Sequence, residues 1–195
     1  MKIYVSVFVL SVLVAVGQCT KIDGPCPIKI KQIETFDVNR YLGKWWDVYA
    51  GSNSYGSCGS GYGCILTYYR LYHEDTHAIP INYFSGPDYA NICSVGIWQT
   101  DYDVDGRLFY DGDDNSIYVL DTDYDSYAVE IACSNDDGTT HEEKVVFRSR
   151  NMTMSAEVRD KLVKKVVDYG FAEPELVAHN FTGCKDFDPD FWHKH

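Results

Sequence analysis

Long hydrophobic runs and basic clusters are both missing from most of this chain. Its one apolar stretch, residues 4–16, is shorter than the roughly 20 residues that a membrane-spanning helix needs. The 17 Lys and Arg residues are outnumbered by 29 Asp and Glu residues, which gives a formal net charge of −12. Nucleic acids and anionic membrane surfaces attract clustered cations. We therefore expect no membrane insertion and no nucleic-acid partner.

Metal-ligand and catalytic patterns are missing as well. No paired CxxC motif lies near a histidine cluster, and the six histidines lack the spacing of a zinc site or of a Ser/His/Asp triad. Asp101, Asp103 and Asp105 begin like a calcium loop, but Gly112 stands where such a loop needs a bidentate glutamate. The sequence thus predicts no metal site and no catalytic residue, and we do not expect an enzyme.

The first 19 residues have the pattern of a secretory signal peptide, with Lys2 before the apolar stretch and Gly17 and Cys19 near the cleavage position. Cleavage there would leave six of the seven cysteines, and an even count in a secreted chain favours disulfides, with ~15 pairings open. We predict an extracellular protein with one domain over residues 20–185 and a flexible tail over 186–195. Asn151 and Asn180 begin N-glycosylation sequons.

Short strand-like runs recur along the rest of the chain, separated by turn clusters rich in Asp, Asn, Ser and Gly. Eight strands are predicted, over residues 44–50, 62–72, 78–84, 89–99, 106–111, 116–121, 126–134 and 142–149. This number matches an all-β, up-and-down antiparallel barrel, whose interior can hold one small ligand. Pro80 within the third run predicts an edge or a bulge there.

One segment near the C-terminus predicts a helix. Ser155 can cap its start, and Gly170 can end it. Between them, apolar side chains recur at helical spacing, at Val158, Leu162, Val166 and Tyr169. A shorter helical turn is expected over residues 36–42, immediately before the first strand.

Three short motifs carry a family resemblance: Gly43-Lys44-Trp45, Thr122-Asp123-Tyr124 and Ser149-Arg150. Together they resemble the conserved blocks of the lipocalin family. The resemblance implies an eight-stranded barrel with the C-terminal helix packed outside. It also implies a barrel floor in which Arg150 packs over Trp45, with Gly43 allowing the tight turn into the first strand.

Other segments are more specific within that family. Cys26-Pro27, the run from Gly43 to Val48, and the segment from Asn180 to Cys184 are similar to those of insect bilin-binding proteins and insecticyanins, and more distantly to apolipoprotein D. The resemblance implies two disulfides, Cys26–Cys133 and Cys64–Cys184. We predict that the two cysteines outside this pattern, Cys58 and Cys93, form a third, although an exchange between Cys58 and Cys64 stays open.

Strand alternation together with the resemblance predicts which side chains face the barrel interior. The predicted ligand-binding set is Asp47, Tyr49, Asn82, Phe84, Asn91, Val95, Ile117, Val119, Ala132, Lys144 and Val146. Glu130 and Cys93 fall on the same predicted rows. Asn82, Asn91 and Lys144 are candidates to hold carbonyl or propionate groups. A register slip of one residue would turn each of them outward.

The resemblance implies a secreted carrier of a small hydrophobic chromophore, with biliverdin as the bound pigment. The alternatives within this class are a carotenoid, a retinoid, a fatty acid or an odorant. Two alternatives belong to other classes. A free Cys93 in the cavity would suit a thiol enzyme, and a filled interior would suit a ligand-free interaction or defence protein. Homo-oligomerisation is left open.

Overall fold

The computed structural model describes residues 21–27, 33, 36–51, 63–70, 78–86, 91–100, 107–109, 116–135 and 138–187. For residues 78–85, 91–100, 107–109 and 116 the description covers the backbone alone. The predicted signal peptide, Cys58, and Asp101, Asp103 and Asp105 of the calcium-like segment lie outside the described residues.

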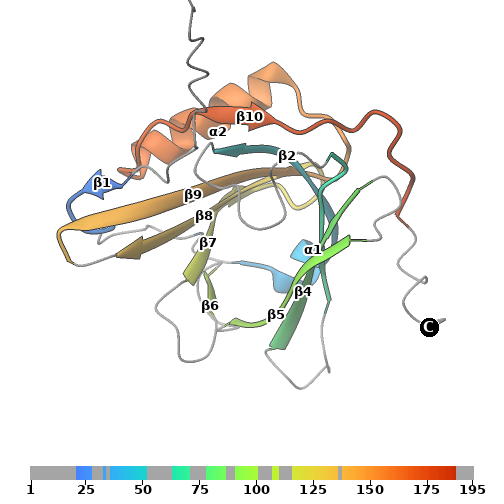
Figure 1. Cartoon of the computed structure of the whole chain (residues 1–195), viewed down its shortest axis with the longest axis horizontal. Helices are drawn as coiled ribbons and strands as arrows, with labels where there is room; N and C mark the ends of the chain where they lie inside the picture. The colour runs from blue at the N-terminus through green and yellow to red at the C-terminus, as the bar shows by residue number, and fades with distance from the viewer. Residues whose placement is uncertain are drawn as a thin grey trace, which may run out of the picture.

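Eight antiparallel strands follow one another in up-and-down order (Figure 1). They are β2 (Gly43–Gly51), β3 (Leu66–Tyr69), β4 (Ala78–Ser85), β5 (Asn91–Thr100), β6 (Arg107–Phe109), β7 (Ser116–Thr122), β8 (Tyr127–Asn135) and β9 (Thr140–Ser149). Each strand pairs with the next, and β9 also pairs with β2, so the pairing returns to its first strand. The predicted fold class is confirmed, although the second strand is shorter than the predicted 62–72.

Two short strands were not predicted. β1 (Ile22–Asp23) pairs with β9, and β10 (Leu176–Ala178) pairs with β2. Neither segment has the length or the alternation that identifies a strand from sequence, because each one extends a sheet edge that already exists. They dock the two ends of the domain onto the barrel wall.

Pro80 lies in β4 opposite Ile97 of β5, but the pairing of β4 with β3 runs only from Ile81 to Phe84. Proline has no N–H to donate. Its place outside the β3 pairing is therefore consistent with the predicted strand edge.

The C-terminal helix, α2 (Ala156–Asp168), forms as predicted and lies along the outer side of the sheet (Figure 1). Ser155 caps it by accepting a hydrogen bond from the Val158 N–H at 3.2 Å. The chain leaves the helix through Gly170, whose φ of +91° belongs to the left-handed region. Leu162 and Val166 are fully buried against outward-facing residues of the sheet, namely Leu120, Val129, Ile131, Val145 and Phe147.

A second outer cluster is covered by the C-terminal segment. Trp46 and Leu66 are buried there together with Phe187, whose ring centroid lies 5.5 Å from that of Tyr68. Phe187 is only 8% exposed. Packed structure thus continues beyond the predicted domain end at residue 185.

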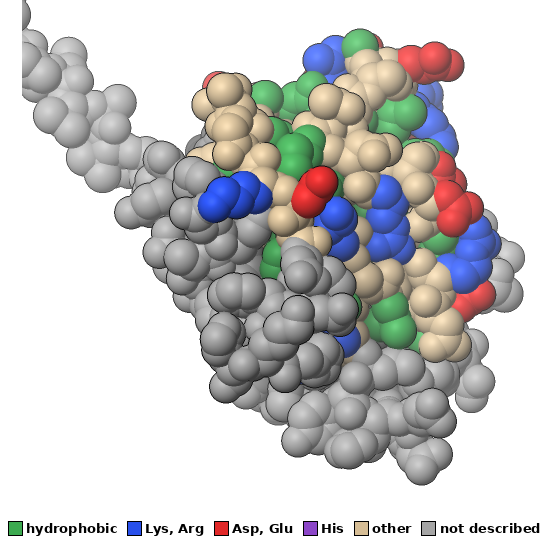
Figure 2. All heavy atoms as spheres, turned by 90° about the vertical axis from the view of Figure 1, so that its right-hand side faces the viewer, with side chains coloured by type: hydrophobic (Ala, Val, Ile, Leu, Met, Phe, Trp, Pro, Cys, Tyr) green, Lys and Arg blue, Asp and Glu red, His purple; other side chains and the backbone are tan. Residues whose placement is uncertain are grey.

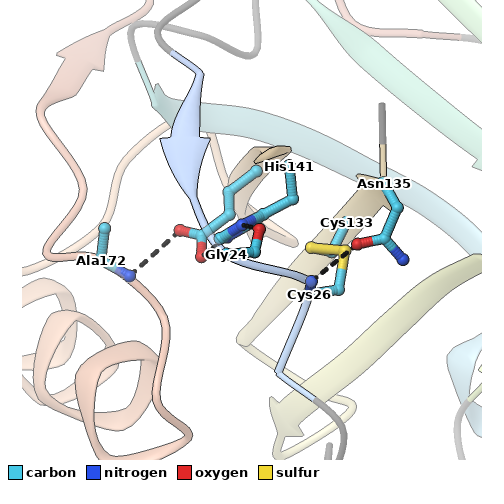
Figure 3. Close-up of a disulfide and its surroundings, with 7 residues drawn as sticks. Gly24, Cys26, Cys133, Asn135, His141 and Ala172 are labelled. Carbon is cyan, nitrogen blue, oxygen red and sulfur yellow. Dashed lines mark hydrogen bonds and ion pairs between the residues drawn. A yellow bond between two sulfur atoms is a disulfide. The ribbon is translucent and has the colours of Figure 1, made fainter. Parts of the chain in front are cut away.

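Two disulfides tie the ends of the domain to the sheet. Cys26 is bonded to Cys133 of β8, with Cα atoms 5.9 Å apart (Figure 3). Cys64 is bonded to Cys184, with Cα atoms 5.5 Å apart. Both bridges are those implied by the family resemblance. The pairing of Cys58 with Cys93 stays a prediction.

Next to the first disulfide, a buried pair, His141 and Glu143 of β9, links three segments (Figure 3). One ring nitrogen of His141 faces the Gly24 carbonyl at 2.8 Å, and the other faces the Glu143 carboxylate at 3.0 Å. Glu143 also accepts a hydrogen bond from the Ala172 N–H at 3.0 Å. Burial lowers the pKa of His141, but the hydrogen bonds to Glu143 and Gly24 outweigh it, so this pKa is raised overall. Two acceptors around one ring favour the imidazolium, which donates to both.

A short helix, α1 (Val38–Tyr41), precedes β2, with Asp37 as its cap.

On the face of the molecule in Figure 2, acidic and basic side chains are interspersed, with hydrophobic side chains between them. No helix in the described part of the chain has the length and hydropathy to cross a bilayer.

Candidate functional site

The closed end of the barrel is filled by aromatic rings and one arginine. Trp45 is fully buried, and its indole N–H donates to the Tyr41 carbonyl at 2.8 Å. The guanidinium carbon of Arg150 lies 3.7 Å from the Trp45 ring centroid. This is a cation–π contact, and the predicted floor pair is confirmed.

Arg150 also joins three segments at this end. Its guanidinium donates to the carbonyls of Lys44 at 2.7 Å, Arg40 at 2.9 Å and Tyr124 at 3.0 Å. Gly43 enters β2 with a φ of +94°, and a Cβ there would lie 3.5 Å from the Arg150 side chain. Arg150 therefore stabilises the floor by donating hydrogen bonds to backbone carbonyls of α1, β2 and the β7–β8 turn.

Above the floor lies a buried group of polar side chains, which we call the interior polar cluster: Asp47, Thr67, Tyr69, Glu130 and Arg148, joined by Tyr41 from the floor. Arg148 pairs with the Glu130 carboxylate at 2.9 Å and also donates to Asp47 and Thr67. Glu130 accepts hydrogen bonds from both tyrosine hydroxyls, at 2.6 Å from that of Tyr69. The cluster connects β2, β3, β8 and β9 across the barrel.

Burial controls the protonation of this cluster. It raises the pKa of Asp47, and the opposite charge of Arg148 counteracts only part of the effect. Burial and the neighbouring Glu130 carboxylate raise the pKa of Tyr41 well above its ordinary value, so this tyrosine stays a hydrogen-bond donor. Two carboxylates against one guanidinium leave a net charge of −1, which protonation of Asp47 would reduce to zero.

Tyr49 does not face the interior, so its assignment to the ligand-binding set was wrong. The β2–β9 register shifts between Asp47 and Tyr49, where Val48 is an extra residue. Such a bulge reverses the inward and outward alternation beyond it. Asp47 therefore points inward as predicted, whereas Tyr49 turns outward toward α2 and lines an outer depression with Arg159.

Exposure increases steadily along the interior rows away from the floor. On β9, Arg148 is buried, Val146 is half-buried and Lys144 is exposed. On β8, Glu130 is buried and Ala132 is half-buried. Water therefore reaches the interior from the end that carries Lys144, which is the open mouth of the barrel.

β7 shows the same change, because Val119 is fully buried and Ile117 is half-buried. Ile117 lies opposite Ala132 and Val119 lies opposite Glu130, so both share the interior face. The structure thus brings part of the predicted set together on one continuous wall: Ile117, Val119, Ala132, Lys144 and Val146.

The backbone register of β4 against β3 is regular. Asn82 lies opposite Tyr68, and Phe84 lies opposite Leu66, both of which belong to the outer face. Opposite residues in an antiparallel pair share a face. In the same pairing, positions 81 and 83 lie opposite Tyr69 and Thr67.

β5 pairs with β4 in turn. Val95 lies opposite Asn82, and Asn91 lies opposite Ser85. The β4–β5 register shifts where Tyr83 and Phe84 face Ser94 and Ile92, so Cys93 has no opposite residue in β4. The inward placement of Asn82, Phe84, Asn91 and Val95 stays a prediction.

The sequence reasoning missed most of the interior polar cluster. Strand alternation could have identified Arg148, because it lies two residues beyond the correctly placed Val146. It could not have identified the partners of Arg148, because Thr67 and Tyr69 lie about 80 residues away on another strand. A buried arginine requires carboxylate partners. This requirement could have indicated that an inward-facing Arg148 meets acidic residues of other strands.

The profile of the Lipocalin / cytosolic fatty-acid binding protein family matches residues 42–182. The bilin-binding protein of Pieris brassicae is 27% identical over 192 residues, which span 91% of this chain and 96% of that protein. Among solved structures, insecticyanin from the tobacco hornworm Manduca sexta superposes with a TM-score of 0.61 at 14% identity, covering 86% of this chain and 93% of its own. Lobster apocrustacyanin A1 superposes with a TM-score of 0.59 at 16% identity, covering 82% and 89%. These two structures share the fold.

Proposed function

This chain belongs to the lipocalin / cytosolic fatty-acid binding protein family, and from that premise we propose that it is a secreted carrier of biliverdin that serves in coloration. At the coarser level it is a carrier of a small hydrophobic ligand. The finer proposal is supported by the likeness to a bilin-binding protein over 91% of the chain.

The observation that carries the proposal is the gradient of the interior wall. Its deep end is closed by the interior polar cluster above the Trp45 and Tyr41 rings, its middle is apolar at Val146 and Ala132, and its rim carries the cation of Lys144. A flat tetrapyrrole with two propionates suits such a wall, because the rings leave water while the charged groups stay at the mouth.

Two features support secretion. The disulfides Cys26–Cys133 and Cys64–Cys184 are of the kind that persists in oxidising compartments. The side chains of Asn151 and Asn180 are exposed, so the folded domain can accommodate a glycan at either sequon.

Titration of the purified protein with biliverdin tests the proposal. We expect one tetrapyrrole per chain, red and near-ultraviolet absorption bands, and quenching of the protein fluorescence. Apolar burial should dominate the affinity, so salt should weaken binding only slightly. If biliverdin fails to bind while a carotenoid or a fatty acid binds tightly, the carrier function stands and the proposed ligand is wrong.

The role of Lys144 can be tested separately. Lys144→Met should weaken biliverdin binding by up to about fivefold, the usual range for an exposed ion pair, and should leave the affinity for biliverdin dimethyl ester unchanged. Lys164→Met is the matched control, because Lys164 is an exposed lysine of α2 that pairs with Asp168. Equal losses for the acid and the ester would contradict a propionate contact at Lys144.

A further inference from the structure

The interior polar cluster places Arg148 inside the barrel, where Asp47 and Glu130 already occupy its guanidinium group. We propose that Asp47 and Glu130 are specificity residues that keep Arg148 from accepting an anionic group, so that acidic ligands bind with the acid at the mouth and the apolar part at the floor. This inference rests on the proposed carrier function, because it concerns the same cavity.

The first argument for the proposal is the geometry of the Arg148 guanidinium. One terminal nitrogen pairs with Glu130 at 2.9 Å, and the other donates to both Asp47 and Thr67. A ligand carboxylate binds best to an arginine that offers two parallel N–H donors. Both terminal nitrogens of Arg148 already face acceptors, and its Nε is buried, so an incoming carboxylate would have to displace an acceptor to gain two parallel donors.

The second argument is the charge of the cluster. Arg148 faces two carboxylates, so its own charge is matched or exceeded whichever protonation state Asp47 adopts. Glu130 is held further by the hydroxyls of Tyr41 and Tyr69. A ligand carboxylate at this depth would lose its hydration and would meet no net positive charge, which is unfavourable.

The third argument is the depth of the cluster inside the barrel. Arg148 and Glu130 are each 2% exposed, whereas Lys144 on the same wall is exposed to water. An acidic group therefore keeps its hydration and gains a cation only at the mouth. Ligand orientation then follows from the charge order along β9, with Lys144 at one end and the neutralised Arg148 at the other.

Palmitate labelled with ¹³C at its carboxyl carbon is a suitable probe, because its single acid group reports its own surroundings. When it is bound to the wild-type protein, its NMR carboxyl signal should titrate like that of a solvent-exposed acid. A bound signal that stays ionised to much lower pH would place the carboxylate at Arg148 and would overturn the inference. This measurement needs no variant.

Glu130→Gln combined with Asp47→Asn provides the complementary test. Glutamine keeps an oxygen for the two tyrosine hydroxyls and removes one of the two carboxylates that face Arg148, and Asp47→Asn in the same variant removes the other. We expect the Kd of palmitate to fall at least about tenfold, while that of methyl palmitate stays unchanged and the carboxyl signal moves to lower pH. Glu130→Gln alone is the second variant, and it should show a smaller gain because Asp47 still faces Arg148. Glu157→Gln on the exposed first turn of α2 controls for net charge.

The outcomes separate the two proposals. Equal gains for palmitate and its methyl ester, or no palmitate binding by either cluster variant, would overturn the inference, because a released Arg148 should capture the acid. Biliverdin titrated into the same preparations reports on the proposed function independently. A variant that gains palmitate while no form binds biliverdin would support the inference and reject the proposed ligand.

Discussion

Removal of Arg150 is the sharpest test of how the barrel is closed. Its guanidinium packs on Trp45 at 3.7 Å and donates to backbone carbonyls from three segments. A desolvated cation–π contact contributes about 2 kcal/mol, and a hydrogen bond from a charged donor contributes about 1.5–3 kcal/mol. Water can replace the bonds to the partly exposed carbonyls, so the contributions are not additive. We expect Arg150→Ala to lower the free energy of unfolding by about 3 kcal/mol.

Urea unfolding with the disulfides intact measures this loss, and the Tm should fall by roughly 6–12 °C for a domain of this size. Arg150→Lys should give an intermediate loss, since an ammonium keeps the charge over Trp45 but cannot reach all three carbonyls. The absorption spectrum of bound ligand should change little, because Arg150 belongs to the floor and not to the interior wall.

Arg159→Ala is the matched control, because Arg159 lies on the outer surface of α2 beside Asp160. Its loss should stay within about 0.5 kcal/mol, as for most surface substitutions. If Arg150→Ala costs no more than Arg159→Ala, the floor pair does not stabilise the barrel and the reasoning is refuted.

Two further predictions concern the ends of the domain. Because the pKa of His141 is raised by its bonds to Glu143 and Gly24, its contribution to stability should be complete below the unfolded-state pKa of about 6.5 and should be lost as pH rises through the folded-state value. Urea unfolding should therefore show a larger deficit for His141→Gln, about 1–3 kcal/mol, at pH 6 than at pH 9, and a constant deficit would contradict the charged state. Non-reducing peptide mapping should find Cys58 bonded to Cys93, and a free thiol at Cys93 would revive the cavity-thiol alternative.

Local patterns in the sequence were sufficient for the eight barrel strands, the C-terminal helix and the fold class, but not for β1 and β10. The helix over residues 156–168 follows from a cap at Ser155, an apolar stripe and a stop at Gly170, all of which act within a few residues. The eight strands follow from alternation and turns. The disulfides and the floor pair came from the family resemblance, because neither spacing nor composition selects one pairing among many.

The inward row of each strand was predictable only where the register was regular. On β8 and β9 the alternation runs unbroken from Tyr127 to Asn135 and from His141 to Ser149, and Ala132, Lys144 and Val146 were placed correctly. On β2 the extra residue Val48 reverses the alternation and sends Tyr49 outward. A bulge depends on how two strands meet, so the sequence of one strand does not reveal it.

The sequence by itself determined the elements, their order and the acidic surface, since these depend on residues near one another in the chain. Only the tertiary structure decided the interior polar cluster, because Asp47, Thr67, Glu130 and Arg148 come from four strands and meet only when the sheet curls round. A buried charge is stabilised by whatever faces it across the barrel. Strand order and register decide which residue that is. Asp47 and Arg148, for example, are 101 residues apart in the sequence.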